Sequence, residues 1–236
     1  MSYVIHWFRQ DLRLKDNPAL YEACKSGYPI LFIYIYDEAT PYKEAEAHNV
    51  WLYYSLKSLC NSLGKHSFRL LIKKGAPQDV FTEIFRYGKP HAIYSNECYD
   101  EFSRERSQNL NYFLEEQGVL SYSFHGNVFC DPDELKDKEG NYLTTFKDYW
   151  RELNARREPK STLPFPKAMP LAYSVKGIEL DDLVLLHSYH WNEQIRKHWK
   201  VGEGEALKKT RAFFKKKVAS YSKHKSFPAE ECTTHL

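Results

Sequence analysis

The sequence predicts an α/β protein: a doubly wound, five-stranded parallel sheet of the Rossmann-like kind, followed by a linker and the start of an α-helical domain. Two features of the first 126 residues carry this prediction. Short apolar runs alternate with helical patterns at the spacing of βαβ units. The run at residues 30–36 (ILFIYIY) is apolar on both faces, which is typical of a buried parallel strand. Such sheets bind ligands at the carboxyl ends of their strands.

The first elements carry clear boundary signals. The apolar run Tyr3–Phe8 predicts a strand. Asn17–Lys25 predicts a helix with Asn17 as its N-cap and Pro18 at its first position. The further expected elements are, in chain order, a strand at 30–36, a helix at 45–63, a strand at 68–72, a helix at 78–87, a strand at 92–95, a helix at 101–116 and a strand at 120–124.

The pattern changes after residue 126, which predicts three parts: an α/β core at 1–126, a closing segment and interdomain linker at 127–190, and the start of a helical domain at 191–236. Four prolines between 158 and 170 indicate the linker. The aromatic residues within 142–150 are expected in the core. The last residues resemble the entrance to another element.

Composition places the chain among soluble globular proteins. It has 236 residues, of which 42% are hydrophobic and 28% charged, and it shows no apolar run long enough to span a bilayer and no leader-like start. Its five cysteines are odd in number and lack CxxC spacing, which argues against a disulfide framework and a zinc site. We therefore expect a cytoplasmic, monomeric protein that does not associate with membranes.

Charge is concentrated near the C-terminus. Residues 196–225 hold eleven Lys and Arg against two Glu, whereas the whole chain carries a net charge of +3. Such a segment is typical either of a helix with a solvated basic face or of contact with a polyanion such as DNA. The solvated face is the favoured interpretation.

Generic catalytic and metal motifs are absent from the sequence: there is no GxGxxG, P-loop, GxSxG or HExxH. His187 and His190 could coordinate a metal but have no Cys or acidic neighbour at ligand spacing. The candidate ligand-binding residues therefore come from the strand ends: Arg9, Tyr36, Asp37 and Asp100. For Arg13 and Asp16, the favoured role is structural pairing at the strand–helix junction.

Residues 7–20, WFRQDLRLKDNPAL, closely resemble the start of the DNA photolyase/cryptochrome family. The resemblance covers essentially the whole chain, in order, and points to the N-terminal α/β antenna domain, the linker and the first part of the FAD-binding helical domain of a class I deoxyribodipyrimidine photolyase. Its further motifs are FIYIYD at 32–37, Ser55-Leu56-x-x-Leu59, Gly75-x-Pro77, Tyr142-x-x-Thr145-Phe146-x-x-Tyr149-Trp150, Trp199-x-x-Gly202-Glu203-x-x-Ala206, and Tyr221-x6-Pro228-x4-Thr233-Thr234-His235-Leu236.

The resemblance implies a light-driven DNA repair enzyme in which reduced FAD transfers an electron to a pyrimidine dimer flipped out of damaged DNA. It assigns Tyr221, Thr233 and Thr234 to the FAD phosphate and Arg9, Tyr36, Asp37 and Asp100 to an antenna chromophore. No residue of the chain is assigned to catalysis. Because the family's helical domain continues far beyond position 236, we expect a truncated protein that is inactive alone.

Several positions depart from the family pattern. Phe102-Ser103 stand where folate-binding members have Asn-Glu, which disfavours folate and leaves a deazaflavin or FMN as the antenna chromophore. Ser107, Ser226, Thr234 and His235 also differ from the usual residues. Two alternatives to the repair enzyme stay open: an α/β domain that binds an antenna chromophore or nucleotide by itself, and a cryptochrome-like fragment that does not repair DNA.

Overall fold

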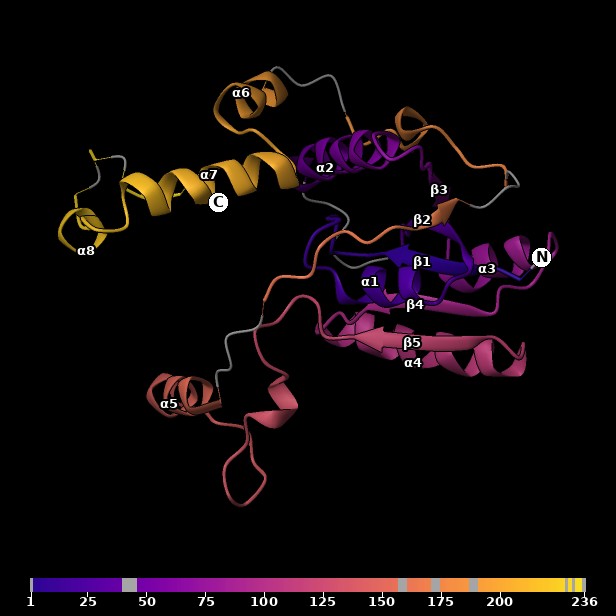
Figure 1. Ribbon diagram of the computed structural model, residues 1–236, viewed down its shortest axis with the longest axis horizontal. Helices are drawn as coiled ribbons and strands as arrows, with labels where there is room; N and C mark the ends of the chain where they lie inside the picture. Colours follow the sequence, from indigo (N-terminus) through magenta and orange to yellow (C-terminus); the bar gives the residue numbers. More distant parts are fainter. Residues whose placement is uncertain are drawn as a thin grey trace. The chain divides into compact units, whose positions relative to one another are not determined.

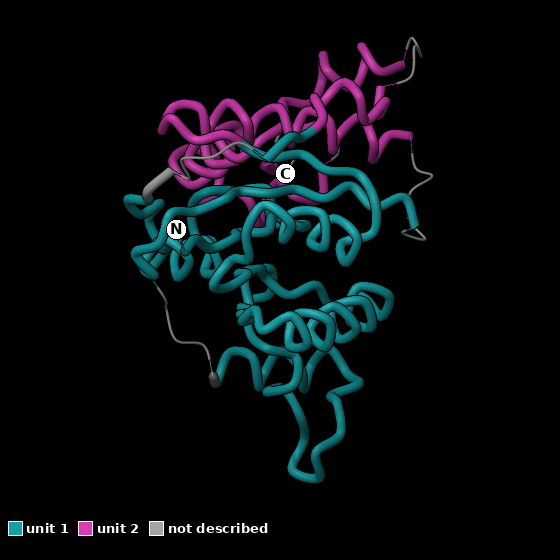
Figure 2. The backbone as a smooth tube through the Cα atoms, turned by 90° about the vertical axis from the view of Figure 1, so that its right-hand side faces the viewer, with its two compact units in different colours: residues 1–41, 70–177 teal, residues 42–69, 178–236 magenta. Residues whose placement is uncertain are grey.

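The computed structural model describes residues 2–39, 46–156, 161–170, 175–186, 191–227, 229–230 and 232–234. Its backbone divides into two compact units, drawn in different colours in Figure 2. Unit 1 comprises residues 1–41 and 70–177, and unit 2 comprises residues 42–69 and 178–236. The division of the chain at residues 126 and 190 stays a prediction.

Unit 1 is built on a parallel sheet with the strand order β3-β2-β1-β4-β5, which confirms the predicted doubly wound arrangement (Figure 1). The order reverses between β1 and β4, so the switch point lies there. A short sixth strand, absent from the prediction, pairs with the first two residues of β2, which β3 leaves uncovered. The strands are β1 (Val4–Phe8), β2 (Pro29–Tyr36), β3 (Leu70–Lys74), β4 (Ala92–Asn96), β5 (Leu120–Phe124) and β6 (Met169–Pro170).

Two helices of unit 1 begin at a residue whose side chain caps them. Asn17 accepts a hydrogen bond from the Leu20 amide and caps α1 (Pro18–Lys25), whose first residue is proline as expected. Asp100 caps α4 (Glu101–Glu116) in the same way, through the Ser103 amide. Between them lies α3 (Pro77–Phe85).

The core lies on both faces of the central strands. All five residues of β1 are buried, as expected for a parallel strand between two layers. One face packs against α3 and α4 in a cluster that includes Trp7, Phe81 and Ile93. The opposite face carries His6, whose ring lies edge-on to Phe8 at 4.4 Å between centroids. His6 is fully buried, and neither ring nitrogen has a hydrogen-bond partner.

Two predicted elements are displaced. The strand expected at 68–72 lies at 70–74, because the turn that ends the preceding helix extends to Phe68, whose amide donates to Leu63 O. The helix expected at 78–87 runs from 77 to 85, because the chain turns at Arg86–Gly88 with backbone bonds to the last helical carbonyls. The other predicted elements before residue 126 agree within one residue among the described positions.

The segment after β5 differs from its prediction. Residues 146–156 form α5 (Phe146–Arg156), preceded by a single 3-10 turn at Pro132–Glu134. The aromatic residues expected in the core are exposed instead: Phe146 is 77% and Trp150 51% accessible. Their spacing of four residues places the rings on one helix face, where they stack at 6.1 Å. That face is not covered by the described part of the chain.

Unit 2 consists of helices. Its longest is α2 (Glu46–Gly64), and the later ones are α6 (Trp191–His198), α7 (Glu203–Lys216) and α8 (Tyr221–His224). The last three have no buried residue. Tyr53 of α2 donates a hydrogen bond of 2.6 Å to Asp181, which holds the 3-10 turn at 180–183 to that helix. No helix among the described residues is long and apolar enough to cross a membrane.

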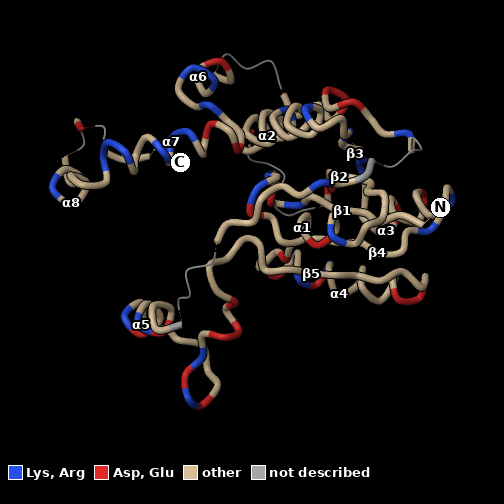
Figure 3. Tube along the Cα trace, viewed as in Figure 1, with Lys and Arg blue, Asp and Glu red and all other residues tan. Residues whose placement is uncertain are grey.

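The basic segment maps onto these later helices, as Figure 3 shows along α6, α7 and α8. In α7, helical spacing puts the basic residues on one side and the apolar residues on the other. The basic side is Lys208, Lys209, Arg211, Lys215 and Lys216, and the apolar side is Ala206, Leu207, Phe213 and Phe214.

Candidate ligand site at the carboxyl edge of the sheet

The switch point between β1 and β4 is held by a buried carboxylate. Asp11, in the loop after β1, accepts hydrogen bonds from the Arg9 amide, from Asn17 Nδ2 at 2.9 Å and from Asn96 Nδ2 at 2.6 Å. Asn96 ends β4, and its side-chain oxygen Oδ1 accepts a hydrogen bond from the Ala19 amide of α1. The loop, the last residue of β4 and the start of α1 are therefore locked together.

A neighbouring glycine completes this packing. A Cβ atom on residue 126 would lie 2.5 Å from Cγ of Asn96, which is an overlap. Glycine is therefore the residue that fits at this position, where the chain after β5 passes the switch point. Arg13 closes the other side, because its guanidinium donates to the carbonyls of Asp16 and Gly126 and to Asn127 Oδ1. This network agrees with the structural role favoured for Arg13.

Asp16 also has structural partners. Its backbone lies in the left-handed region, with φ of 51°, a conformation that Asp tolerates because its short side chain bonds locally. Its amide donates to Leu163 O, and its side chain accepts from the Leu163 amide. The proline-rich segment expected as a linker is thus tied to the sheet's carboxyl edge at Leu163.

Arg9 and Arg106 form the cationic part of the site. Arg106, from α4, is ion-paired with Asp37, which directly follows β2. Arg9 lies over the Trp7 ring at 4.8 Å and donates to Ser107 Oγ at 3.0 Å, and no carboxylate pairs with its side chain among the described residues. Burial, and then the charge of Arg9, lower the pKa of the Arg106 guanidinium.

Asp100 approaches the same edge from the start of α4. Gln10 Nε2 donates to its carboxylate at 3.4 Å. Burial alone would raise the pKa of Asp100, but hydrogen bonds from Ser103 and Gln10 outweigh burial and hold it below the usual value. Burial also raises the pKa of the nearby Cys98 thiol, which therefore stays protonated at neutral pH.

The structure brings three of the four predicted edge residues together around the first turns of α4: Arg9, Asp37 and Asp100. Tyr36 has different neighbours. Burial, followed by the charge of Glu38, raises the pKa of the Tyr36 phenol, although the charge of Lys74 acts in the opposite direction. Neither Glu38 nor Lys74 belongs to the site that Arg9 and Arg106 form. An anion placed at this edge would meet Arg9 as the cation without an opposing carboxylate.

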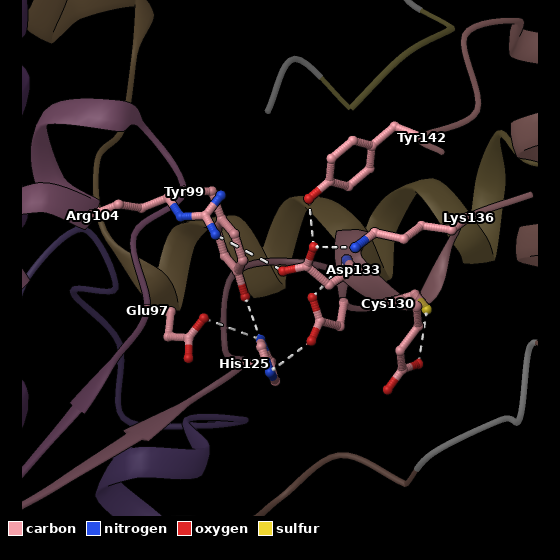
Figure 4. Close-up of polar contacts among 10 residues, drawn as sticks. Glu97, Tyr99, Arg104, His125, Cys130, Asp133, Lys136 and Tyr142 are labelled. Carbon is pink, nitrogen blue, oxygen red and sulfur yellow. Dashed lines mark hydrogen bonds and ion pairs between the residues drawn. The ribbon is translucent and has the colours of Figure 1, made fainter. Parts of the chain in front are cut away.

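A second polar cluster, not predicted from the sequence, lies beyond the ends of β4 and β5 (Figure 4). His125 Nδ1 lies 2.8 Å from Tyr99 Oη and 3.4 Å from Glu97, and its Nε2 lies 3.2 Å from Asp131. Burial, followed by the charges of Glu97 and Asp131, raises the pKa of Tyr99 to about 12. The phenol is therefore protonated throughout the neutral range.

The same cluster extends to the segment after β5. Asp133 is approached by Lys136 at 3.1 Å and by Arg104 of α4 at 3.9 Å, and it accepts a hydrogen bond from Tyr142. Figure 4 shows these side chains converging on Asp133. The cluster anchors residues 130–142 to the sheet. Only the positions of Glu97 and His125, directly after strands, could have indicated it in the sequence.

The residues assigned to the FAD phosphate lie in unit 2. Tyr221 begins α8, and its ring packs edge-on against Phe213 of α7 at 5.6 Å. Thr233 accepts a hydrogen bond from Lys217 Nζ through its carbonyl oxygen at 3.4 Å. Both residues are therefore tied to the end of α7, and Thr234 follows next in the chain. Pro228, His235 and Leu236 lie outside the described residues.

The described residues contain no group of three or more His, Cys, Asp or Glu side chains that could hold a metal. His187 and His190, the metal candidates from the sequence, lie outside the described part of the chain.

Comparison with known proteins gives a consistent result. The family model described as DNA photolyase matches residues 4–170. The chain is 30% identical over 236 residues to the deoxyribodipyrimidine photo-lyase of Agrobacterium fabrum, covering 99% of this chain and 49% of that protein. It is 28% identical over 229 residues to cryptochrome-2 of Arabidopsis thaliana, covering 93% of this chain and 37% of that protein.

A solved structure agrees with these relatives. The chain superimposes with a TM-score of 0.94 and 28% identity on a bacterial class III photolyase from Agrobacterium tumefaciens, over 100% of this chain and 49% of that one. The chain thus spans about half the length of the photolyases it matches, and the likeness includes both the sheet and the helices after it.

Proposed function

The chain belongs to the DNA photolyase family, and on that premise we propose that it is the first half of a light-driven enzyme that repairs cyclobutane pyrimidine dimers in damaged DNA. The observation that carries the proposal is the 30% identity to a deoxyribodipyrimidine photo-lyase over 99% of this chain. Because the chain spans about half of that relative, we propose that repair requires the other half of the fold.

The residues assigned to FAD suit a phosphate group chemically. The Tyr221 and Thr233 hydroxyls, with Thr234, can donate hydrogen bonds to an anion. Lys217, which reaches Thr233, supplies a positive charge beside them. Reduced FAD, when bound, supplies the electron for the dimer. In this proposal, the chain's own residues only orient the phosphate, and the groups that contact the flavin ring and the dimer come from the other half.

A chimera tests the proposal. It joins residues 1–236 to the part of the Agrobacterium fabrum photo-lyase that follows the matched half. The expected result is FAD retained after purification and light-dependent repair of an oligonucleotide carrying a thymine dimer. The 236-residue chain alone should show neither stoichiometric flavin absorbance nor repair. A folded chimera without flavin, or robust repair by the chain alone, would contradict the proposal.

Variants of the chimera test the assigned residues. Tyr221→Phe combined with Thr233→Val should lower FAD retention, because both hydroxyl donors are lost. Thr210→Val is the matched control, since the Thr210 hydroxyl donates to Ala206 O within α7 and has no assigned role at the phosphate. Equal flavin retention in the double variant and in the Thr210→Val control would show that the Tyr221 and Thr233 hydroxyls do not bind the FAD phosphate.

A second candidate function rests on Arg9, whose guanidinium has no carboxylate partner among the described residues at the edge where such sheets bind ligands. The α/β unit would bind an anionic antenna chromophore, a deazaflavin or FMN rather than a folate. Titration of the chain with FMN should show saturable quenching that Arg9→Gln weakens and Arg86→Gln, an exposed arginine after α3, leaves unchanged. Absence of binding at a high FMN concentration would exclude this second candidate function.

The cryptochrome-like alternative is supported by the 28% identity to cryptochrome-2. The chimera separates the two functions only through its repair activity. FAD bound with a light response but without dimer repair, in a chimera whose second half comes from a repair enzyme, would favour the alternative.

A further inference from the structure

The edge strand β5 differs from the other strands of the sheet. The four residues Leu120–Ser123 are exposed, whereas every residue of β1 and β4 is buried. Leu120 is 46% and Tyr122 41% accessible. Figure 1 shows β5 as the outermost strand beside β4, and no described strand pairs with its outer edge. Exposed apolar side chains and an open edge therefore occur on the same strand.

The backbone groups on that open edge can be assigned. The Leu120 amide donates to His91 O and Phe124 O accepts from the Glu97 amide, so the groups of residues 120 and 124 point toward the β4 side. Backbone groups alternate in direction along a strand. Hence the N–H and C=O groups of Ser121 and Ser123 point outward, away from the sheet.

The sequence of β5 is symmetric about its centre. Leu120, Tyr122 and Phe124 share one face, where Tyr122 lies 5.0 Å from the Tyr94 ring, and the two serines share the other. An antiparallel copy centred on Tyr122 places Leu120 opposite Phe124 of the copy and Ser121 opposite Ser123. The outward groups then form hydrogen-bonded pairs, and Tyr122 meets its own copy in a non-hydrogen-bonded pair, at about 4.5 Å between Cα atoms.

The edge also lacks the features that usually prevent such pairing. Residues 118–126 (GVLSYSFHG) contain no Asp, Glu, Lys, Arg or Pro. The opposite edge strand, β3, is different. It carries Lys73 and Lys74, and Gly177 lies so close to it that a Cβ atom there would stand 3.0 Å from Ile72 O. The β3 edge of the sheet is therefore charged and covered, whereas the β5 edge is uncharged and open.

We propose that β5 pairs antiparallel with β5 of a second copy of this chain, centred on Tyr122, to form a two-fold dimer with a continuous sheet. An isologous interface requires a self-complementary patch, and a strand symmetric in both its side chains and its outward backbone groups meets that requirement. The proposal replaces the expectation of a monomer and does not depend on the proposed function, because repair and flavin binding involve other residues.

The test is the mass of the full chain in solution, measured by light scattering coupled to size exclusion. The wild type should have twice the 27.9 kDa of one chain. Ser123→Pro should be monomeric, because it removes an outward N–H while the bonds of Leu120 and Phe124 on the β4 side remain. Tyr112→Lys should stay dimeric, since Tyr112 is an exposed aromatic residue of α4 outside the edge strand.

A charge-pairing experiment tests the register. Tyr122→Lys and Tyr122→Glu should each be monomeric, because the same charge would face itself across the two-fold axis. Mixing the two folded variants should restore a dimer, since Lys then faces Glu. Circular dichroism establishes that each variant is folded.

A wild-type chain that stays monomeric at its highest soluble concentration would overturn the proposal. So would a dimer that survives both Ser123→Pro and Tyr122→Lys, or folded charge variants that fail to associate when mixed.

Discussion

The aromatic residues of the sheet and those of the later helices occupy opposite environments. Phe8 and Phe32 in the sheet, and Phe81 of the helix α3 that packs on it, are almost entirely buried. On α5 and α7, Phe146, Trp150 and Phe214 are each more than half exposed. Buried aromatic rings stabilise a fold, whereas exposed ones contribute little until something covers them. The sheet therefore has a core of its own, and the helical segments carry apolar surface that is available for contacts.

This difference bears on the proposed function. The candidate phosphate residues Tyr221 and Thr233 are held by α7 and α8, helices without a buried residue. The candidate anion site at Arg9 lies on the sheet, beside the buried Asp11 network. We expect the edge site to be preformed in the chain alone and the phosphate residues to need the rest of the fold.

The largest expected effect comes from removing a buried aromatic ring. Phe81→Ala should lower the free energy of unfolding by about 3–5 kcal/mol, because the Phe81 ring packs edge-on against Trp7 at 5.6 Å and leaves a cavity. Phe146→Ala, at an exposed ring of the same type, should change it by less than about 0.5 kcal/mol. Urea titration measures the free energy of unfolding of both variants. Equal losses in the two variants would contradict the difference between buried and exposed rings.

The next effect comes from the buried polar network. Asp11→Ala should cost about 3 kcal/mol, because the Arg9 amide and the side-chain amides of Asn17 and Asn96 each lose a hydrogen bond to the buried carboxylate. Glu22→Ala, which breaks an exposed ion pair with Lys25, should cost less than about 1 kcal/mol. A small loss for Asp11→Ala in the same urea titration would mean that water replaces the carboxylate.

Acid should destabilise the sheet through His6. Burial lowers the pKa of His6 to about 4 from 6.5 and outweighs the opposing influence of Asp11. The unfolded chain therefore binds a proton that the folded chain does not, so stability is lost as pH falls from about 6.5 toward 4, by at most about 3 kcal/mol. His6→Leu should flatten this part of the pH profile. An unchanged difference between pH 7 and pH 4.5 would contradict the assignment.

The smallest effect is expected in unit 2. Tyr53→Phe removes the hydrogen bond to Asp181, which also raises the pKa of Tyr53 to about 12, and should cost about 1 kcal/mol. Tyr54→Phe, on the neighbouring position of α2, is the control. If both variants melt at the same temperature as the wild type, the bond adds nothing to stability.

The elements of the sheet could be predicted because strands such as β1 and β2 are continuous apolar runs and because two helices, α1 and α4, start after a capping residue, Asn17 and Asp100. The exposed ring face of α5 could not. The spacing of Phe146 and Trp150 shows that they share a helix face but not whether anything covers it. Strand β6 is two residues long and too short to show periodicity.

Only part of the candidate site could be predicted from the sequence. Strand ends indicate where side chains meet, which brought Arg9, Asp37 and Asp100 to the same edge. The pairing of Arg106 with Asp37 and the cluster around His125 join residues far apart in sequence. Such pairings depend on the angle at which α4 and the segment after β5 cross the sheet, and no local pattern encodes that angle.

Hydrogen exchange of the full chain, followed by mass spectrometry at peptide resolution, tests most directly whether the two regions differ as described. Amides in β1, β2 and β4 should exchange only on global unfolding, because these strands are buried between two layers. Amides in α5, α7 and α8 should exchange orders of magnitude faster, through local opening. Protection of α7 equal to that of β1 would contradict the account, because it would mean that the helices already form a complete core.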